Sequence, residues 1–581
     1  MAPLPEKRHA AYELAGVCLL LIVLSLQLFL SVRRESQTWD EGDHIFAGYR
    51  MWTHGDYGLN PEHPPLLKLL ATTPLLSMQL KTPTLEERFF KEDAFLRGKE
   101  FLYQNDADKI LARTRTAAAV LALLTALVVF FATKEMFGRG AAFIALTLLV
   151  FDPNLLAHGA LITNDVGFAC FMLLSVYLFY RFVKAPSAMR LFMVGVSVGL
   201  TLAVKHTGVL ILPVLFLLAV CEIIRVNNRR RHALKTLGSF VLIILIGWVV
   251  LWSFYKFRYD ARPNGLQLNP PLAEYVKRLQ PHEAWPITTM ARLRLLPESY
   301  LYGMADIKLT ANYYTSYVLG KVYAHSVWFY FPITFLIKST VGFLALLLLS
   351  LIVIGMRRLS WGREILFLLV PPLVYLIVAL TVGMNIGVRH VLIVYVFLYV
   401  IVGGAAWAII ETKRKWMYAV AVLLLLHMAS SLNTYPNYIA YGNELWGGSS
   451  QTHKHLTDSN ADWGEQLKSV KQYLDHRGVK ECWFVYFAAG VAEPSYYGIP
   501  CKPLPTVNTL WLNLPIEVPK SINGPVLISA SNLSGFEFGP GPLDPYGQFR
   551  LLTPTAVIDR GVFVFDGTFE LPLAAAIRKG Q

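Results

Sequence analysis

Charged residues are scarce in this chain. Asp, Glu, Lys and Arg make up 16% of its 581 residues, whereas a soluble protein carries roughly 25%. Hydrophobic residues make up 55%, and they fall in long blocks separated by short polar segments. Such blocks indicate a polytopic membrane protein rather than a soluble one.

Acidic residues are fewer than basic ones, 39 against 53, which gives a formal net charge of +14. A nucleic-acid-binding protein would also be basic. Here, however, Lys and Arg gather in short clusters between the apolar blocks. The tendency of cytoplasmic loops to be basic explains this pattern, so we expect a lipid bilayer and no nucleic acid as partner.

Cysteine is also sparse, and the five cysteines have no metal-ligand spacing. Three of them (Cys18, Cys170 and Cys221) lie in apolar blocks, where we expect them to pack. Cys482 and Cys501 lie in the polar C-terminal part, and they can pair if that part is extracytoplasmic. A GxxxxGK[ST] motif and a cytoplasmic Gly-rich βαβ unit are both absent, which argues against a nucleotide substrate used in the cytoplasm.

The apolar blocks predict about eleven transmembrane helices. Each block approaches the 20 residues that a helix needs to cross the hydrocarbon core, except where Lys205 divides one long run into two short helices. The predicted spans are 11–32, 111–132, 139–157, 165–183, 189–204, 206–223, 236–254, 331–355, 364–383, 389–410 and 416–432.

The basic clusters predict the orientation of these spans. With the N-terminus inside, all six short basic loops fall on the cytoplasmic side, as the positive-inside rule requires. The outer side then receives a first long loop (33–110), a second long loop (255–330) and the C-terminal part. We therefore predict two domains, a membrane domain over 1–432 and an extracytoplasmic soluble α/β domain over 433–581.

Local patterns refine the two outer regions. In the first loop, His44 to His54 and Leu66 to Leu80 have helical apolar spacing, typical of interfacial helices. In the C-terminal domain, DWGEQLKSVKQYLDHRG reads as an amphipathic helix that ends at Gly478. The runs ECWFVYF, GPVLISA and GVFVFDGTF read as strands.

Several charged residues from distant parts of the chain are predicted to meet at the outer membrane face. Charges at membrane depth are costly and usually have a partner or a function. Structural roles are also open to them, because Lys and Arg at span ends reach for headgroups and Asp165 suits a helix cap. Lys205 is the sharpest candidate, since it interrupts an apolar run. The set is Asp40, Glu41, Arg113, Arg115, Asp165, Lys205, Arg389 and His390.

These residues sit in motifs that resemble the GT-C membrane glycosyltransferases. The resemblance is to the protein O-mannosyltransferase family and its bacterial phospholipid-carrier-dependent relatives. It covers residues 33 to about 470 and implies a GT-C type fold. The motifs are WDE at 39–41, HPPLLKLL at 63–70, AVKHTG at 203–208, NIGVRH at 385–390 and DSNADWGEQLK at 458–468.

Two departures limit what the resemblance implies. Lys205 is followed by His-Thr rather than Trp-Val, and loop 255–330 is too short for the β-trefoil of the eukaryotic mannosyltransferases. Neither mannose nor a protein acceptor is therefore implied. Aminoarabinose transfer to lipid A uses a related fold, so the acceptor hydroxyl can belong to a protein Ser or Thr, a glycan or a lipid.

The resemblance implies a polyprenyl-phosphate-linked sugar as donor and an inverting transfer at the outer face. We expect Asp40 to take the proton of the acceptor hydroxyl and Glu41 to orient the acceptor or a sugar hydroxyl, while Asp43 caps the helix that begins near His44. The residues expected to bind the donor phosphate are Lys205, Arg389, His390, and Arg113 or Arg115. Those expected to bind substrate are His63, Lys68, Asp165, His206, Tyr302 and Tyr313, although the tyrosines also suit interfacial anchors.

The scheme requires no cofactor. A divalent metal fits it only if the fold brings Asp40, Asp165 and His63 together. The rival interpretation is a lipid or solute transporter, or flippase, without transfer chemistry; a non-catalytic scaffold is a third. A repeat typical of many transporters is not visible in the sequence. The expected location is the bacterial inner (plasma) membrane.

Overall fold

The computed structural model describes residues 6–86, 88–225, 229–263, 265–311, 314–356, 362–381 and 383–571. All eleven predicted spans contain helix, and the chain is an integral membrane protein. Seven helical segments are long and apolar enough to cross a membrane by length and composition. Their helices are α1 (Glu6–Val32), α5 (Ala107–Phe137), α8 (Asn164–Lys184), α10 (Ile211–Arg225), α11 (Arg229–Phe254), α17 (Arg363–Thr381) and α18 (Leu392–Thr412).

The remaining predicted spans form shorter or broken helices. They are α6 (Arg139–Val150) with α7 (Pro153–His158), α9 (Ala188–Val204), α15 (Tyr330–Lys338) with α16 (Val341–Gly355), and α19 (Trp416–Leu432). The predicted span 331–355 is bent by 115° between α15 and α16. One local and one long-range contact stabilise the bend: Thr340 caps α16 through the Phe343 amide, and the Lys338 ammonium donates to the Ile439 and Asn460 carbonyls.

The predicted break at Lys205 is present. Its backbone is extended between α9 and a 3₁₀ turn, η2 (His206–Leu210), which leads into α10. Gly208 makes this tight connection feasible, because a Cβ at that position would lie 2.2 Å from the Thr201 carbonyl oxygen. The break therefore leaves the Lys205 side chain at the ends of two helices.

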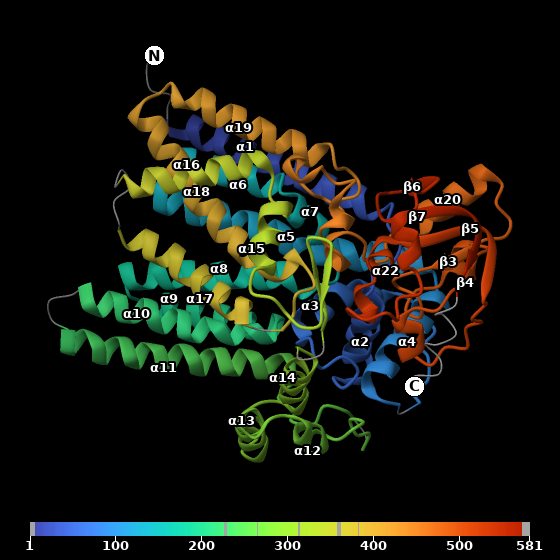
Figure 1. Ribbon diagram of the computed structural model, residues 1–581. Coiled ribbons are helices and arrows are strands. Elements are labelled where there is room, and N and C mark those ends of the chain that lie inside the picture. Colours follow the sequence, from blue (N-terminus) through green and yellow to red (C-terminus); the bar gives the residue numbers. More distant parts are fainter. Residues whose placement is uncertain are drawn as a thin grey trace.

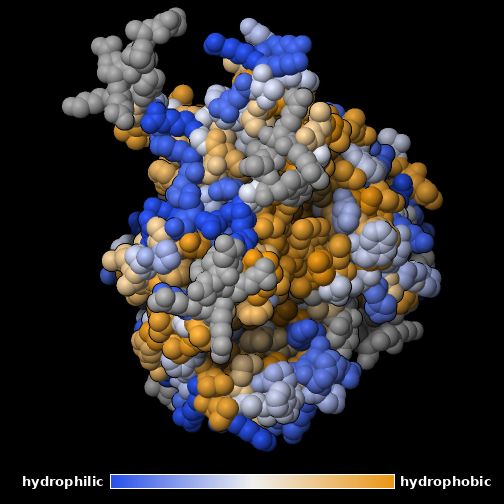
Figure 2. Space-filling model, turned by 90° about the vertical axis from the view of Figure 1, so that its left-hand side faces the viewer, coloured by the Kyte–Doolittle hydropathy of each residue, from blue (hydrophilic) through white to orange (hydrophobic). Residues whose placement is uncertain are grey.

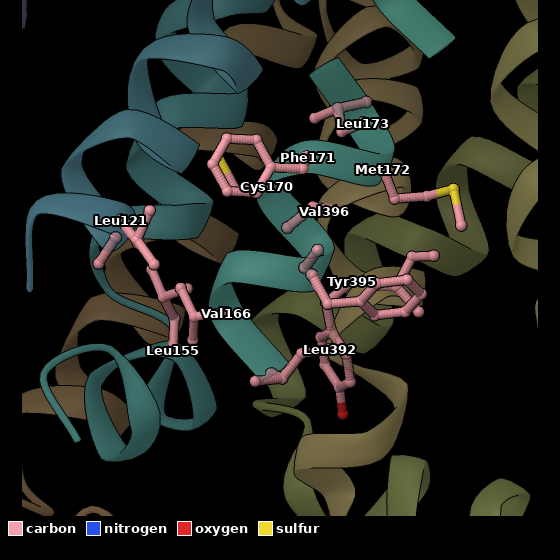
Figure 3. Packing of buried hydrophobic residues seen from close by; sticks show 14 of the residues in the cluster. Leu121, Leu155, Val166, Cys170, Phe171, Met172, Leu173, Leu392, Tyr395 and Val396 are labelled. Atoms are coloured by element: carbon pink, nitrogen blue, oxygen red, sulfur yellow. The ribbon is translucent and has the colours of Figure 1, made fainter. Parts of the chain in front are cut away.

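Helix α8 lies at the centre of the bundle and is buried along almost its whole length. It packs against α5, α9 and α18. Figure 3 shows side chains of α8, such as Val166 and Phe171, beside Leu121 of α5 and Tyr395 of α18. Packing of this kind holds membrane helices together, since lipid tails are as apolar as the side chains themselves.

Other helices expose apolar side chains where lipid would surround them. On α1 these include Leu14, Leu19 and Ile22. Figure 2 shows the end of the molecule at the left of Figure 1, where hydrophilic side chains fringe a recessed hydrophobic area. Apolar side chains that face outward from a helix bundle are typical of a membrane-embedded protein.

The first outer loop folds into three helices, α2 (Glu41–His54), α3 (Pro65–Thr72) and α4 (Phe90–Tyr103). Every residue of α2 from Glu41 to Met51 is buried, and the helix packs against α3 and α4. Only its last turn, including Trp52, is exposed. In contrast to a helix lying flat on lipid, α2 is therefore enclosed by protein on all sides.

The second outer loop adds α12 (Leu272–Tyr275), α13 (Pro281–Arg292), α14 (Glu298–Ala311) and the hairpin of β1 (Ser316–Val318) and β2 (Lys321–Tyr323). Figure 1 shows α12, α13 and α14 together below α11, at one side of the bundle of membrane helices. Tyr57 of the first loop accepts a 2.7 Å hydrogen bond from Ser299 at its carbonyl, which ties α14 to the segment after α2.

The C-terminal part contains a five-stranded mixed sheet in the order β4-β3-β5-β7-β6. The three predicted strands are present, with β3 parallel to β4 and β5, and β7 antiparallel to its neighbours β5 and β6. The predicted helix, α20, ends at Gly478 but begins only at Leu467. The elements are β3 (Trp483–Val485), β4 (Lys502–Pro503), α21 (Val507–Trp511), β5 (Ser521–Ser529), α22 (Ala530–Ser534), β6 (Ala556–Ile558), β7 (Val562–Glu570) and α20 (Leu467–Arg477).

Cys482 and Cys501 form a disulfide in this domain. Figure 1 shows the domain beside α2 and α4, at the opposite end of the helical bundle from the N-terminus. The two predicted outer regions therefore lie together, and the site described next is formed between them and the ends of the membrane helices.

Candidate active site

A cavity of ≈ 630 Å³ opens where the two long loops (33–110 and 255–330), the ends of the membrane helices and the C-terminal domain meet. Six of the predicted site residues line it: Asp40, His63, Asp165, Lys205, Arg389 and His390. They come from five separate stretches of the chain. The cavity thus gathers five of the eight residues that the topology predicted at one membrane face.

Four of these residues form a continuous chain of charges. Arg389 Nη1 lies 3.0 Å from Asp40 Oδ2 and 3.8 Å from Asp165 Oδ2. Asp165 Oδ1 lies 2.5 Å from Lys205 Nζ. Two cations and two carboxylates therefore alternate along the cavity wall, and each holds its neighbour in place.

These four side chains lie together because each belongs to a helix start or to a break between helices. Asp40 is the N-cap residue of α2, and Asp165 lies in the first turn of α8. Lys205 occupies the break before η2, while Arg389 lies in η4 (Val388–Val391), which leads into α18. Carboxylates are favourable at helix N-termini because the helix dipole is positive there.

The carboxyl group of Asp40 has an unusual environment for an ionisable group. Burial raises its pKa above the ordinary aspartate value, although Arg389 acts in the opposite direction. A carboxylate with a raised pKa is a stronger base than an ordinary one. Asp40 thus combines exposure to the cavity with enhanced basicity.

Asp43 also lines the cavity, one helical turn after Asp40. Its Oδ2 accepts a 2.6 Å hydrogen bond from Asn60 Nδ2, and burial together with nearby Asp40 raises its pKa well above the ordinary value. The prediction that Asp43 caps a helix beginning near His44 was wrong, because the helix begins at Glu41 and Asp43 lies inside its first turn.

A second group of polar residues lines the cavity away from Lys205. Lys91 Nζ lies 2.8 Å from Asp306 Oδ2, and Tyr275 Oη donates to Asp306 Oδ1 at 2.6 Å. Burial raises the pKa of Glu62 to about 7; nearby Lys91 lowers it and Asp306 raises it. Tyr314 lines the same part of the wall. This group can bind a hydroxyl-rich ligand, since it offers both donors and acceptors.

Several buried polar atoms on the cavity wall have no hydrogen-bond partner within the described part of the chain. Buried polar groups in proteins are nearly always paired, so unpaired ones need an explanation. Similar atoms occur elsewhere in the protein, but those on the cavity wall can be paired by a polar ligand bound there. The residues are Asp43, His44, Glu62, Thr163, Asn164, Arg389 and His390.

Glu41 and Arg115 lie outside the cavity wall. Arg115 binds both Glu41 oxygens, at 2.9 and 2.5 Å, and also donates to the carbonyls of Val32 and Ser36. Both side chains are buried. The expected roles of Glu41 in orienting the acceptor and of Arg115 in binding phosphate are therefore corrected, because each residue is occupied by the other.

Other expected site residues also have partners elsewhere. Arg113 donates to the Pro74 carbonyl, and Lys68 Nζ donates to the Asn60 carbonyl at 2.5 Å. His206 Nε2 contacts the Pro61 carbonyl at 3.1 Å, and Tyr302 donates to the Pro270 carbonyl at 3.0 Å. None of these four side chains lines the cavity. The expected Tyr313 lies outside the described residues.

A metal site was conditional on Asp40, Asp165 and His63 coming together. All three line the cavity. Among the described residues, however, no group of three or more His, Cys, Asp or Glu side chains is arranged to hold a metal ion. Asp40 and Asp165 instead bind Arg389 and Lys205.

Several cavity residues were not predicted from the sequence, because a charged or polar residue is conspicuous only where it lies within an apolar span. Lys91 and Asp306 lie in polar stretches of the two outer loops, where charged residues are ordinary. Asn508 and Trp511 come from the C-terminal domain. Glu62, Trp39 and Thr207 had a usable signal, because Glu62 directly precedes the HPPLLKLL motif and the other two lie in the WDE and AVKHTG motifs.

The chain matches the family described as dolichyl-phosphate-mannose-protein mannosyltransferase over residues 109–252. This stretch contains Asp165 and Lys205, whereas Asp40 and Arg389 lie outside it. No curated relative matches the chain.

Several solved structures are similar to the chain, among them the following three. ArnT from Cupriavidus metallidurans bound to undecaprenyl phosphate has 13% identity and a TM-score of 0.47, with 95% of this chain and 98% of ArnT covered. AglB, the oligosaccharyltransferase of Archaeoglobus fulgidus, has 12% identity and a TM-score of 0.44, with coverage of 90% and 70%. The Pmt1-Pmt2 complex of S. cerevisiae bound to the sugar donor has 14% identity and a TM-score of 0.33, with coverage of 44% and 34%.

The motifs are not the only sign of the resemblance, because the match to the family model over residues 109–252 points the same way. It lies in the part of the membrane domain that carries Lys205 and Asp165. The predicted resemblance is therefore confirmed over residues 109–252, where the chain is similar to the dolichyl-phosphate-mannose-protein mannosyltransferase family.

Proposed function

We propose that the chain is an inverting glycosyltransferase that moves a sugar from a polyprenyl-phosphate carrier to an acceptor hydroxyl at the outer face of the membrane. The observation that carries this proposal is the alternating chain Asp40–Arg389–Asp165–Lys205 on the wall of one cavity. It offers a base and a pair of cations within one small site, which are the groups that such a transfer needs.

Asp40 acts as the base in this proposal. Its carboxylate takes the proton of the acceptor hydroxyl while the acceptor oxygen forms a bond to the anomeric carbon. The bond from that carbon to the phosphate oxygen breaks at the same time, and the lipid phosphate leaves with the electron pair. A single displacement of this kind inverts the anomeric centre.

Lys205 and Arg389 stabilise the charge that develops on the leaving phosphate. Both keep donor capacity beyond their carboxylate partners, since an ammonium has three N–H donors and a guanidinium has five. Arg389 Nε has no partner in the described part of the chain. Because the phosphate leaves as a stable anion, no carboxylic acid is needed to protonate it, in contrast to glycosidases.

Apolar residues extend the cavity on the Lys205 side. Leu210, Val378 and Ala379 line it, together with Tyr375. They come from η2 and α17, two elements at membrane depth. This side suits the polyprenyl chain, whereas the Glu62, Lys91 and Asp306 side suits the sugar or the acceptor.

An extracytoplasmic position for the C-terminal domain completes the proposal. The disulfide between Cys482 and Cys501 supports it, because disulfides persist in oxidising compartments. The bacterial inner membrane is the proposed location.

The test uses membranes that contain the full chain and a radiolabelled polyprenyl-phosphate monosaccharide. Asp40→Asn should abolish transfer of label while the protein still accumulates in membranes. Asp108→Asn is the matched control, because Asp108 is a half-exposed carboxylate of the same outer loop that pairs with Lys468. Full transfer by Asp40→Asn would contradict the assignment of the base.

A further inference from the structure

The segment from Asp458 to Gln466 links the C-terminal domain to both halves of the candidate active site. It precedes α20 and consists of the turn η7 (Asp458–Asn460) followed by residues of the motif DWGEQ. All nine of its residues are buried. We call this segment the clamp turn.

The clamp turn binds the backbone just before Arg389. Ser459 Oγ donates to the Ile386 carbonyl at 3.0 Å, and Asn460 Oδ1 accepts from the Val388 amide at 2.9 Å. Gly387 lies between these two contacts, where a Cβ would stand 2.2 Å from Ser459 Oγ. The turn that presents Arg389 is therefore pressed directly onto the clamp turn.

The same segment binds the backbone just before Asp40. The Trp39 amide donates to the Trp463 carbonyl at 3.0 Å, and the Ser36 amide donates to the Glu465 carbonyl at 2.9 Å. Ser36 Oγ in turn accepts from the Leu467 amide at 3.1 Å. The position of Asp40 thus depends on the clamp turn from the opposite side.

Trp463 completes the link through its ring. The Arg389 guanidinium carbon lies 4.1 Å from the centre of the Trp463 ring, and the Trp463 residue is 1% exposed. A cation over an indole face is attracted most strongly when both groups are withdrawn from water. The indole therefore holds the face of the guanidinium while Asp40 holds one of its edges at 3.0 Å.

From these contacts we infer that Trp463 is a positioning residue that sets the Asp40–Arg389 contact, so that the active site is complete only with the C-terminal domain in place. The inference rests on the proposed function for its kinetic consequence. Its structural consequence does not depend on the proposed function: without the indole face, the guanidinium of Arg389 moves away from Asp40.

The test compares Trp463→Phe and Trp463→Leu in the full-length protein. Both substitutions remove the indole. Phe still presents an aromatic face to Arg389, whereas Leu does not. Trp463→Leu should lower kcat about tenfold, because a desolvated cation–π contact and a tenfold rate change are of similar size. Donor KM should change far less, and Trp463→Phe should recover most of the rate.

A pH profile separates positioning from mere folding support. Since Arg389 lowers the pKa of Asp40, its displacement should raise that pKa and move the acidic limb of kcat to higher pH in Trp463→Leu. A fall in the amount of folded enzyme would lower the whole profile without moving the limb. Trp483→Leu is the matched control, because Trp483 faces Lys502 in the same domain, away from the cavity.

A cryo-electron microscopy structure of Trp463→Leu decides the inference independently of transfer. Separation of Arg389 from Asp40 in this variant supports the inference. This holds even if the wild type transfers no sugar, because in that case only the proposed function fails. An unchanged Arg389–Asp40 contact, or a wild-type pH limb in an active Trp463→Leu enzyme, would overturn it.

Discussion

Glu41 and Arg115 form a buried ion pair in which Arg115 Nη2 lies 2.5 Å from Glu41 Oε2. The Thr38 amide also donates to the same oxygen at 3.0 Å. Burial alone would raise the pKa of Glu41, but Arg115 and these hydrogen bonds hold it below the ordinary value. Asp40 and Glu41 are adjacent in the sequence, yet the structure gives them separate environments.

This ion pair predicts that Glu41→Gln mainly destabilises the protein. Removing one partner leaves Arg115 buried without its counter-charge, which costs about 3–5 kcal/mol. Transfer per folded molecule should change much less than in Asp40→Asn. The thermal stability of purified protein and its specific activity measure the two effects, and the double variant Glu41→Leu/Arg115→Met should recover part of the stability. If the specific activity of Glu41→Gln were as low as that of Asp40→Asn, Glu41 would have a direct role in transfer.

Lys205→Ala should impair use of the donor. Loss of one group that stabilises developing charge typically lowers the rate by about 10²–10³, and we expect a fall of that order in kcat/KM for the labelled donor. Lys205→Arg should retain part of the activity, because it keeps the charge near Asp165. Lys109→Ala, which removes an exposed lysine of α5, serves as control; equal effects of the two alanine variants would argue against a phosphate site at Lys205.

The pH dependence of transfer should follow Asp40. As a base, Asp40 works in its ionised form, so activity should disappear as the pH falls through its pKa. Burial raises this pKa, so the midpoint of the acidic limb should lie above the ordinary aspartate value of about 3.9. Arg389→Gln should move the midpoint further up, by about one unit or more, because it removes the opposing cation. A midpoint that moves down would contradict the geometry.

The disulfide predicts a stability difference confined to the C-terminal domain. Cys482 and Cys501 are separated by 19 residues, and closing a loop of this size contributes about 3 kcal/mol in the chain-entropy account. The double variant Cys482→Ser/Cys501→Ser should therefore be cleaved earlier in this domain during limited proteolysis of the full chain. Cys18→Ser, which changes a free cysteine, should behave like the wild type.

The orientation can be measured with a membrane-impermeant thiol reagent. In a background without the free cysteines, Lys480→Cys should be labelled in intact cells, because it is exposed on the C-terminal domain. Lys413→Cys lies in the basic segment between α18 and α19, and it should be labelled only after permeabilisation. The reverse pattern would place the site on the cytoplasmic side.

The membrane helices could be predicted from the sequence because their signal is local. Each apolar run contains helix, and Gly478 ends α20 as expected. The bend between α15 and α16 was not visible, because it depends on Lys338 reaching the carbonyls of Ile439 and Asn460, about a hundred residues away in the chain. Hydropathy reports length and composition, and it carries no information about such distant contacts.

The candidate site was predictable where a charged residue lies within or at the end of an apolar span, or in one of the motifs. Lys205 and Arg389 have this signal, and both line the cavity. Arg115 has the same signal but pairs with Glu41, so the signal alone does not separate a ligand-binding cation from a structural one. Lys91 and Asp306 have no such signal, since they lie in polar loops.

By itself, the sequence determined the class of protein, the helical segments, the motifs and the membrane face on which they were expected to meet. The spacing of apolar residues and the local composition decide these features, because both are properties of short stretches of the chain. Only the tertiary structure decided which carboxylate of the WDE motif faces the cavity, and that the clamp turn, with Trp463, lies against Asp40 and Arg389. These outcomes depend on contacts between segments more than 300 residues apart, as in the hydrogen bond from Arg389 to Asp40, and packing in three dimensions alone establishes them.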